Sequence, residues 1–246
     1  MDTIFKTQNG TFKIYEPDYI ISGWVSGGCI YDHNLLNNYL QPIITKAQYI
    51  VDAGANIGCH SISYANFNPD AKIYSFEPQS DIFSILETNK RLNGSSNVTC
   101  FCKALGHANK LINMNKPLKT EDGTNYAGTG VGQGGESTEM ITLDSLDLPG
   151  LDFIKMDVQG SEGLVIMGGR NTIDKYSPII LFEHDDTFVI PEHVGLTEVP
   201  TPFFELVKLG YNTFKYLGEH NYITYRDTEL NFEDAFKKTL FSDTSS

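Results

Sequence analysis

Residues 49–61, YIVDAGANIGCHS, combine an apolar run, an acid, a glycine-studded turn and a helix start. Asp52 ends the apolar run, which is typical of a buried strand. Gly54 allows a tight turn, and Gly58 allows the following helix to pack closely on the strand. Asn56 tolerates a left-handed backbone better than most residues. The bend therefore predicts a strand–turn–helix unit whose backbone a ligand approaches closely.

The same alternation of strand and helix continues along the chain. Helix signals are clearest over residues 80–93, where Asp81 lies in the first turn and Gly94 follows the last. Alternating elements of this kind predict an α/β fold: a mostly parallel sheet with helices on both faces and its ligand site at the carboxyl ends of the strands. The expected strands are 49–53, 72–78, 97–105, 151–158 and 178–186, and the expected helices are 58–65, 80–93, 161–167 and 202–209.

The chain is expected to form one domain, residues 1–246. It would consist of an N-terminal strand and helix extension (1–46), a core (47–186) and a C-terminal helix and hairpin (187–246). The hairpin, YNTFKYL to NYITYR, would add an antiparallel strand to the sheet. Residues 115–137 are rich in glycine and polar side chains, so they bury little and predict either a lid or a flexible surface insertion.

Composition narrows the function. A net charge of −13 argues against a nucleic-acid partner, because binding to phosphates needs a basic surface. The four cysteines form no Cys-x-x-Cys pair and are expected to be reduced. The N-terminus lacks the apolar stretch of a signal peptide, and no run is long enough to span a membrane. We therefore expect a cytoplasmic protein with no membrane association.

An acid at the end of the second strand points to a ribose. Glu77 is placed to accept hydrogen bonds from two ribose hydroxyls. A dinucleotide would also bring a pyrophosphate to the turn, where Asp52 repels it and Asn56 replaces a glycine. S-adenosylmethionine has no phosphate and carries a sulfonium cation, which suits an acid at position 52. The residues therefore favour S-adenosylmethionine over NAD.

The blocks VDAGANIGCHSISYA, IYSFEPQSDIFSILETNKRLN, VTCFCKALG, ITLDSLDLPGLDFIKMDVQGSEGLVIMGG and PIILFEHD, in this order, resemble the FkbM family of S-adenosylmethionine-dependent methyltransferases. The resemblance covers roughly residues 47–186. It implies a Rossmann-like seven-stranded methyltransferase fold and an O-methyltransferase acting on hydroxyls of natural products and sugars.

The resemblance also implies roles for individual residues. It places the Gly54 turn around the methionine part of the donor, Glu77 on the ribose and Asp157 beside the amino acid end. The implied cofactor-binding residues are Asp52, Gly54, Ala55, Asn56, Gly58, Glu77, Pro78, Ala104, Leu105, Asp157 and Val158, with Ala104 and Leu105 at the adenine. The family often has Glu where this chain has Gln159, so an acid–base role is not expected at that position.

Methyl transfer to a hydroxyl needs alignment and a group that takes the proton. His184 is the leading candidate base, because an ordinary histidine is mostly neutral at pH 7. Glu183 would orient it, and Asp157 is the third catalytic candidate, although donor binding suits it better. The sequence EHDD (183–186) could also bind a divalent cation, but it matches no specific ligand motif, and no metal is expected.

These observations together predict an S-adenosylmethionine-dependent O-methyltransferase whose acceptor is a hydroxyl of a sugar or glycan. The alternatives are a methyltransferase acting on another small molecule or a protein side chain, an NAD-dependent oxidoreductase, and a non-catalytic module of the same fold in a glycan-synthesis complex. The sequence does not specify the oligomeric state.

Overall fold

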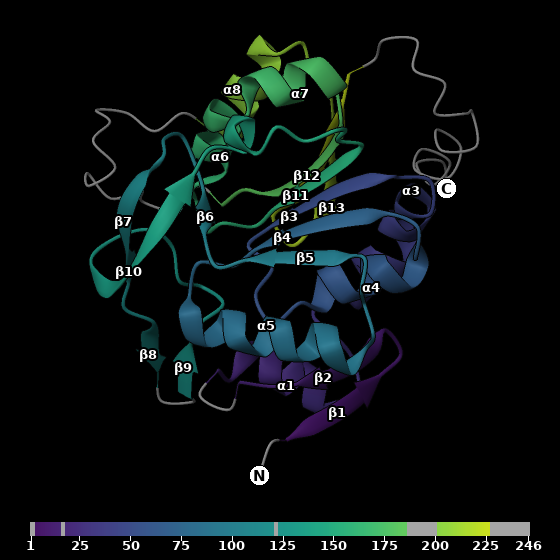
Figure 1. The fold of residues 1–246 in the computed structure, drawn as a ribbon, viewed down its shortest axis with the longest axis vertical. Coiled ribbons are helices and arrows are strands. Elements are labelled where there is room, and N and C mark those ends of the chain that lie inside the picture. The colour runs from purple at the N-terminus through teal and green to yellow at the C-terminus, as the bar shows by residue number, and fades with distance from the viewer. Residues whose placement is uncertain (1–2, 16–17, 121–122, 186–200, 227–246) are drawn as a thin grey trace.

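The computed structural model describes residues 3–15, 18–120, 123–185 and 201–226. Within these residues the central sheet has seven strands in the order β13-β14-β12-β11-β3-β4-β5 (Figure 1). Neighbouring strands from β12 to β5 are parallel, whereas β14 runs antiparallel to both β12 and β13. The expected α/β fold with a C-terminal antiparallel hairpin is thus confirmed. The strands are β3 (Tyr49–Ala53), β4 (Lys72–Phe76), β5 (Val98–Phe101), β11 (Phe153–Met156), β12 (Ile179–Glu183), β13 (Thr213–Gly218) and β14 (Asn221–Tyr225).

Helices cover both faces of this sheet, and side chains alternate between two cores. Ile50 and Phe153 point into the core beneath α4 (Cys59–Phe67) and α5 (Ser80–Leu92). Val51 and Ile154, one residue further along their strands, belong to the opposite core under α6 (Glu162–Gly168) and α7 (Arg170–Tyr176). Figure 1 shows α4 and α5 on one side of the sheet and α6, α7 and α8 (Pro202–Lys208) on the other.

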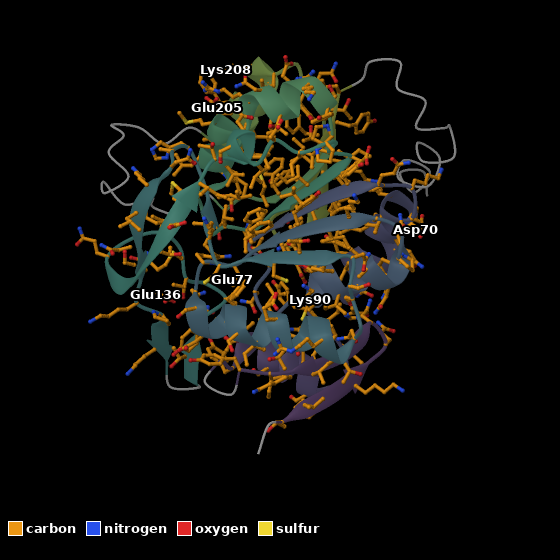
Figure 2. All side chains as sticks on the ribbon, viewed as in Figure 1. Asp70, Glu77, Lys90, Glu136, Glu205 and Lys208 are labelled. Carbon is orange, nitrogen blue, oxygen red and sulfur yellow. The ribbon has the colours of Figure 1, made fainter. Side chains whose placement is uncertain are left out.

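The α8 helix is joined to its neighbours by a buried acid. Glu205 accepts hydrogen bonds from Arg170 of α7 and, at 3.1 Å, from Lys208 one turn later. Figure 2 shows Glu205 and Lys208 at one end of the molecule, far from Asp70. None of the helices in the described ranges combines the length and the apolarity that crossing a bilayer requires.

The N-terminal extension packs beneath α4 and α5. It begins with a hairpin of β1 (Ile4–Thr7) and β2 (Gly10–Lys13). Asn89 of α5 fixes the hairpin, because its side chain bonds both the N–H and the carbonyl of Lys13. The helical part of the extension consists of α1 (Ile20–Ser26), α2 (His33–Leu35), the π-helical turn η1 (Leu36–Leu40) and α3 (Gln41–Ile44). On the opposite face of the sheet, α7 has no counterpart among the expected helices.

The strand predicted over residues 97–105 is wrong as a single element. Its first part is β5, but Ala104–Leu105 form β6, which pairs with β10 (Gly134–Ile141). Together with β7 (Lys110–Asn115) they form a second sheet ordered β6-β10-β7. The neighbouring β4 ends before Pro78, which cannot donate to a ladder, so the edge strand loses its partner there and turns away. Cys102 therefore lies beyond β5 and is exposed, whereas Cys100 lies within β5.

Residues 115–137 are more ordered than the prediction of a surface loop. They contain β8 (Leu118–Thr120) and β9 (Gly123–Asn125) and follow β7 (Lys110–Asn115). Thr129 is buried, and Gln79 donates a hydrogen bond to the Tyr126 carbonyl at 3.2 Å. The predicted boundary between residues 186 and 187, and most of segment 187–246, lie outside the described residues.

Candidate functional site

The glycine-studded turn after β3 has the backbone conformation that its sequence predicts. Gly54, Asn56 and Gly58 have φ angles of +77°, +50° and +93°. A Cβ added to Gly54 would lie 1.8 Å from the backbone oxygen of Asp157. Gly54 is therefore required by the close approach of the β11 end as well as by its positive φ. The turn brings the carboxyl ends of β3 and β11 into contact.

A cavity opens above this turn, at the carboxyl ends of the parallel strands. It also extends to residues of the N-terminal extension and of the segment after β9. Most of the predicted site residues line it: Gly54, Ala55, Asn56, Glu77, Pro78, Ala104, Leu105, Asp157, Val158 and Glu183. Asp52, Gly58 and His184 are not among the lining residues. Their roles toward a ligand stay predictions, and their positions are described below.

Glu77 forms one end of the cavity. Its carboxylate accepts the backbone N–H of Asn56 at 3.0 Å and that of Gln79 at 2.8 Å. Burial raises the pKa of Glu77 to about 7, against the lowering effect of these two bonds. Figure 2 shows Glu77 inside the fold near the start of α5. Both carboxylate oxygens are thus positioned by backbone groups while the side chain still faces the cavity.

A polar row lies beneath the other end of the cavity. Asp52 is opposite Ser75 of β4 and Lys155 of β11 in the strand register. Asp52 has no exposed surface, and its carboxylate accepts the Ser61 hydroxyl of α4 at 2.5 Å. Its other oxygen lies 3.6 Å from the Lys155 ammonium. Because the side chain of Asp52 is fully buried beneath the cavity, it influences the charge in the cavity through its ion pair with Lys155.

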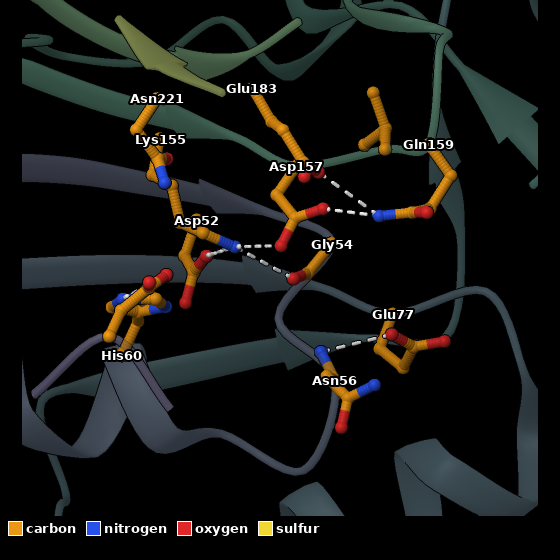
Figure 3. Close-up of polar contacts among 12 residues, drawn as sticks. Asp52, Gly54, Asn56, His60, Glu77, Lys155, Asp157, Gln159, Glu183 and Asn221 are labelled. Carbon is orange, nitrogen blue, oxygen red and sulfur yellow. Dashed lines mark hydrogen bonds and ion pairs between the residues drawn. The ribbon is translucent and has the colours of Figure 1, made fainter. Parts of the chain in front are cut away.

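No role was predicted for Lys155, but its ammonium contacts the polar groups at this end of the cavity. Only 4% of it is exposed, and its ammonium bonds the Gly54 carbonyl at 3.1 Å and Asp157 at 3.3 Å (Figure 3). The surrounding carboxylates Asp157, Asp52 and Asp32 hold the pKa of Lys155 above its usual range despite burial. A lysine within the apolar strand FIKM was the available signal, because a buried lysine needs acid partners.

Asp157 and Glu183 carry one negative charge between them. Burial opposes the ionisation of Asp157, but Lys155 and hydrogen bonds from Glu183 and Gln159 hold its pKa below the ordinary value. Burial and the charge of Asp157 raise the pKa of Glu183 to about 9. Gln159 donates to both carboxyls, at 2.8 Å and 3.2 Å (Figure 3). At neutral pH Asp157 is therefore ionised and Glu183 is a neutral acid.

The turn after β11 is built to present Gln159. This residue has a φ of +53°, which is uncommon outside glycine. Glu162 at the start of α6 accepts the N–H of Val158 at 2.9 Å and stabilises the turn. Glu162 is 2% exposed and lies in the first turn of α6, where a carboxylate interacts favourably with the helix dipole.

His184 directly follows β12 and is not among the residues that line the cavity. Its N–H bonds the His220 carbonyl at 2.9 Å, and its ring meets Phe203 edge-on at 5.2 Å. Asp185 lies 3.9 Å from His220, and Asp186 is outside the described residues. Among the described residues no group of three His, Cys, Asp or Glu side chains is arranged to hold a metal.

Further residues outside the predicted site bear on the cavity or its rim. His60 is 7% exposed and lines the cavity. Trp24 and Phe204 are large apolar side chains that are 45% and 58% exposed. Tyr31 and Asp32, which no sequence signal indicated, complete the cavity wall beside His60. They come from the N-terminal extension, whose contact with the turn depends on tertiary packing.

The segment after β9 covers the cavity. Asn125, Ala127, Gly128, Thr129 and Val131 contribute to its wall. Buried Asp18 holds this segment, because its carboxylate accepts the N–H of Tyr126 at 3.3 Å and that of Ile21 at 3.1 Å. Of the two predictions for residues 115–137, a wall of the site fits this arrangement better than an unattached insertion.

The chain is similar to known methyltransferases. Residues 52–198 match the family described as methyltransferase FkbM domain. The FkbM methyltransferase of Methylobacillus flagellatus KT superposes with a TM-score of 0.50 and 16% identity, over 73% of this chain and 43% of that chain. A putative methyltransferase, yhhF, of Escherichia coli superposes with a TM-score of 0.49 and 13% identity, over 92% of this chain and 100% of that chain. TYW2 of M. jannaschii, solved in complex with AdoMet, superposes with a TM-score of 0.43 and 13% identity, over 91% of this chain and 83% of that chain.

At these identities the structural likeness shows the fold alone. The chain spans less than half the length of the Methylobacillus protein. No curated protein sequence matches it significantly.

Proposed function

The chain belongs to the FkbM methyltransferase family, and we propose that it transfers a methyl group from S-adenosylmethionine to a hydroxyl of a sugar or glycan. The observation that carries the proposal is a single cavity with Glu77 at one end and ionised Asp157 at the other, joined by the Gly54 turn. This spacing of acids along the carboxyl ends of β4, β3 and β11 suits a ligand with a ribose and a cationic group.

The residues present fit this donor along the whole cavity. Glu77 would accept the ribose hydroxyls, and the apolar side chains of Ala104 and Leu105 would contact the adenine. Asp157 would face the amino group, because it keeps its charge at neutral pH. When bound, the sulfonium supplies an activated methyl group. The chain itself would bind, orient and desolvate the two reactants.

A phosphate-bearing dinucleotide suits the same cavity poorly. The turn between β3 and α4 offers Asn56 where a pyrophosphate favours glycine backbone, and α4 begins beside buried Asp52. The charge of the chain, −13, also disfavours nucleic acid as acceptor. The choice of a sugar or glycan rests on the family resemblance.

The test is calorimetric titration of the protein with S-adenosylhomocysteine and, separately, with NAD. Micromolar binding of the first and none of the second is expected. Methyl transfer from labelled S-adenosylmethionine to methyl glycosides and oligosaccharides is then followed by mass spectrometry. Binding of NAD alone would overturn the donor, and methylation of only proteins or non-sugar compounds would overturn the acceptor class.

A matched pair of variants ties binding to the cavity. Glu77→Gln removes the charge at the ribose end, whereas Glu87→Gln changes an acid on α5 that pairs with Lys90 and Arg91 and does not line the cavity. The first variant should weaken binding of S-adenosylhomocysteine and the second should not. Equal affinities for the two variants would contradict the assignment of Glu77 to the ribose.

A further inference from the structure

An unsatisfied histidine and a strained aspartate face each other across the end of the cavity opposite Glu77. His60 lies in the first turn of α4, and its Nε2 is buried without a hydrogen-bond partner. Asp32 Oδ2 lies 3.8 Å away, and the two side chains are 9% and 7% exposed. Both residues line the cavity. A buried polar atom of this kind is uncommon unless a ligand or water completes it.

The separation fits one oxygen atom between the two groups. A distance of 3.8 Å exceeds a direct hydrogen bond. An oxygen placed beside both could lie at about 2.8 Å from each, which is an ordinary hydrogen-bond length. A hydroxyl can donate to the carboxylate and bond the imidazole nitrogen at the same time. The pair is therefore shaped for a hydroxyl group.

The backbone holds Asp32 in a conformation that favours this position. Its φ is +61°, and its carbonyl accepts the N–H of Leu36 at 2.9 Å as α2 begins. Left-handed non-glycine residues are sparse and concentrate at functional sites. The conformation directs the chain from Tyr31, in the cavity wall, into α2.

An aromatic surface adjoins the pair. Tyr31 contacts Trp24 edge-on, with ring centroids 6.2 Å apart, and Trp24 also lies 6.2 Å from His33. Trp24 is 45% exposed although it is a large apolar side chain. Aromatic rings offer a broad apolar face with little conformational entropy to lose, which suits the C–H face of a sugar ring. The surface thus continues the cavity outward from Tyr31.

We infer that Asp32 and His60 bind the acceptor hydroxyl, with Asp32 as the catalytic base and Tyr31 and Trp24 contacting the rest of the sugar. This inference rests on the proposed function. As the acceptor oxygen bonds the methyl carbon, the carbon–sulfur bond breaks and its electron pair stays on sulfur. The hydroxyl proton passes to the Asp32 carboxylate and then to water. The products are the methyl ether and S-adenosylhomocysteine.

The charges around Asp32 are compatible with this role. Around it lie Lys155 of β11, Asp157 just after β11, Glu219 of the β13–β14 turn and His60 of α4. Burial, with Asp157 and Glu219, raises the pKa of Asp32 to about 7, and Lys155 opposes the rise. Burial and Lys155 lower the pKa of His60 to about 3, so the imidazole is neutral. A base with a pKa near the working pH is efficient in proton transfer.

The experiment uses the only tryptophan of the chain as a reporter. Methyl glycosides of glucose, galactose, mannose and rhamnose are added to the protein saturated with S-adenosylhomocysteine, and Trp24 emission is recorded. Methylation of the same compounds is measured by mass spectrometry with S-adenosylmethionine. A saturable emission change and a methylated product are expected for at least one glycoside. Flat emission and no product for all four, with S-adenosylhomocysteine bound, overturn the inference.

Variants then separate the base from a structural residue. Asp32→Asn keeps the shape and should lower turnover about 10²- to 10⁴-fold, with the affinity for S-adenosylhomocysteine changed less than about threefold. At saturating S-adenosylmethionine, turnover of the wild type is expected to rise with pH through about 7, and Asp32→Asn should abolish this rise. His60→Gln should raise the KM for the glycoside more than it lowers kcat. Asp70→Asn, an exposed acid at the far side of the molecule (Figure 2), is the matched control and should leave both unchanged.

Three results would overturn the inference in different ways. Wild-type turnover in Asp32→Asn shows that another group takes the proton. Loss of S-adenosylhomocysteine affinity in parallel with turnover assigns Asp32 to the donor. Failure of the wild-type protein to bind S-adenosylhomocysteine sinks the proposed function itself, and with it this inference.

Discussion

The two ends of the cavity hold their carboxylates in opposite ways. Glu77 is fixed by backbone N–H groups of Asn56 and Gln79, which follow β3 and β4 directly. Asp157 is fixed by side chains, the ammonium of Lys155 and the amide of Gln159. A backbone N–H is retained in every substitution except one to proline, whereas any substitution of Lys155 or Gln159 removes a side-chain partner of Asp157. The Glu77 end is therefore set by chain geometry and the Asp157 end by charge balance.

The contrast extends to how each end depends on the rest of the fold. Lys155 also approaches Asp52, which in turn bonds Ser61 of α4. The charge of Asp157 is thus linked to a row of buried groups that crosses three strands. This row consists of Lys155, Asp52 and Ser75 and is called the charge row below. Glu77 needs only the two turns that flank it. Disturbance of the charge row should therefore affect folding, and disturbance of Glu77 should affect mainly binding.

The largest effect is expected from Lys155→Met, which removes the cation from the charge row. Asp52 and Asp157 would remain without their buried partner, which typically costs about 3–5 kcal/mol. Urea unfolding would measure the loss. Lys90→Met, which breaks a surface pair with Glu87 at 3.8 Å, is the control and should cost at most about 1 kcal/mol. The double variant Asp52→Asn with Lys155→Met should recover part of the stability. Similar losses for Lys155→Met and Lys90→Met would refute the charge-row account.

Glu77→Gln should affect ligand binding more than stability. At pH 8 the affinity for S-adenosylhomocysteine should fall about 10- to 100-fold, because hydrogen bonds to a charged group contribute roughly 1.5–3 kcal/mol. The pKa of Glu77 is raised to about 7, so below that pH the wild type must lose a proton to bind. Its affinity should then fall about tenfold per pH unit, whereas the variant stays nearly flat. Calorimetry at pH 6, 7 and 8 measures both. An equal pH dependence in wild type and variant would assign the proton to another group.

The same contrast explains how much the sequence alone could predict. The β3 strand, the turn and Glu77 were predicted because their chemistry is local: an apolar run, glycines and an acid before Pro78. The Asp157 end was predicted only in part. Asp157 and Glu183 lie at strand ends, so the sequence pattern identified them as candidates. Lys155 is important only because the strand register places it opposite Asp52. No local pattern encodes that register.

The N-terminal extension shows the same limit. Asp32 and His60 are 28 positions apart and meet because the extension packs against α4, which depends on tertiary contacts. The segment after β9 was read as surface because it is rich in glycine, yet Asp18 binds it from outside its own sequence neighbourhood. Composition indicates how much surface a segment can bury by itself. Here the segment is held by a hydrogen bond to Asp18, an acid far away in the sequence.

Glu183→Gln should change the pH dependence of stability. The pKa of Glu183 is raised to about 9 in the folded protein, so the folded state holds a proton that the unfolded state releases near pH 4.5. The contribution of this group is complete below about 4.5 and declines as the pH rises toward 9. Gln mimics the protonated acid, so the variant should melt a few degrees higher at pH 8 and at the same temperature as wild type at pH 4.5. Each kcal/mol corresponds to about 2–4 °C. A difference that is independent of pH would contradict the shared-proton account of Asp157 and Glu183.

The smallest effect concerns the turn that positions Glu77. Asn56 has a φ of +50°, and its side chain accepts the Ile57 N–H at 2.8 Å. Asn56→Gly and Asn56→Ala both lose that bond, but only Ala is strained by the left-handed backbone, by about 1–2 kcal/mol. Thermal unfolding should therefore rank Ala below Gly by a few degrees, with a parallel but smaller loss of S-adenosylhomocysteine affinity. Equal melting temperatures would mean that the left-handed turn does not fix the N–H that meets Glu77. That end of the cavity would then depend on side chains, as the Asp157 end does.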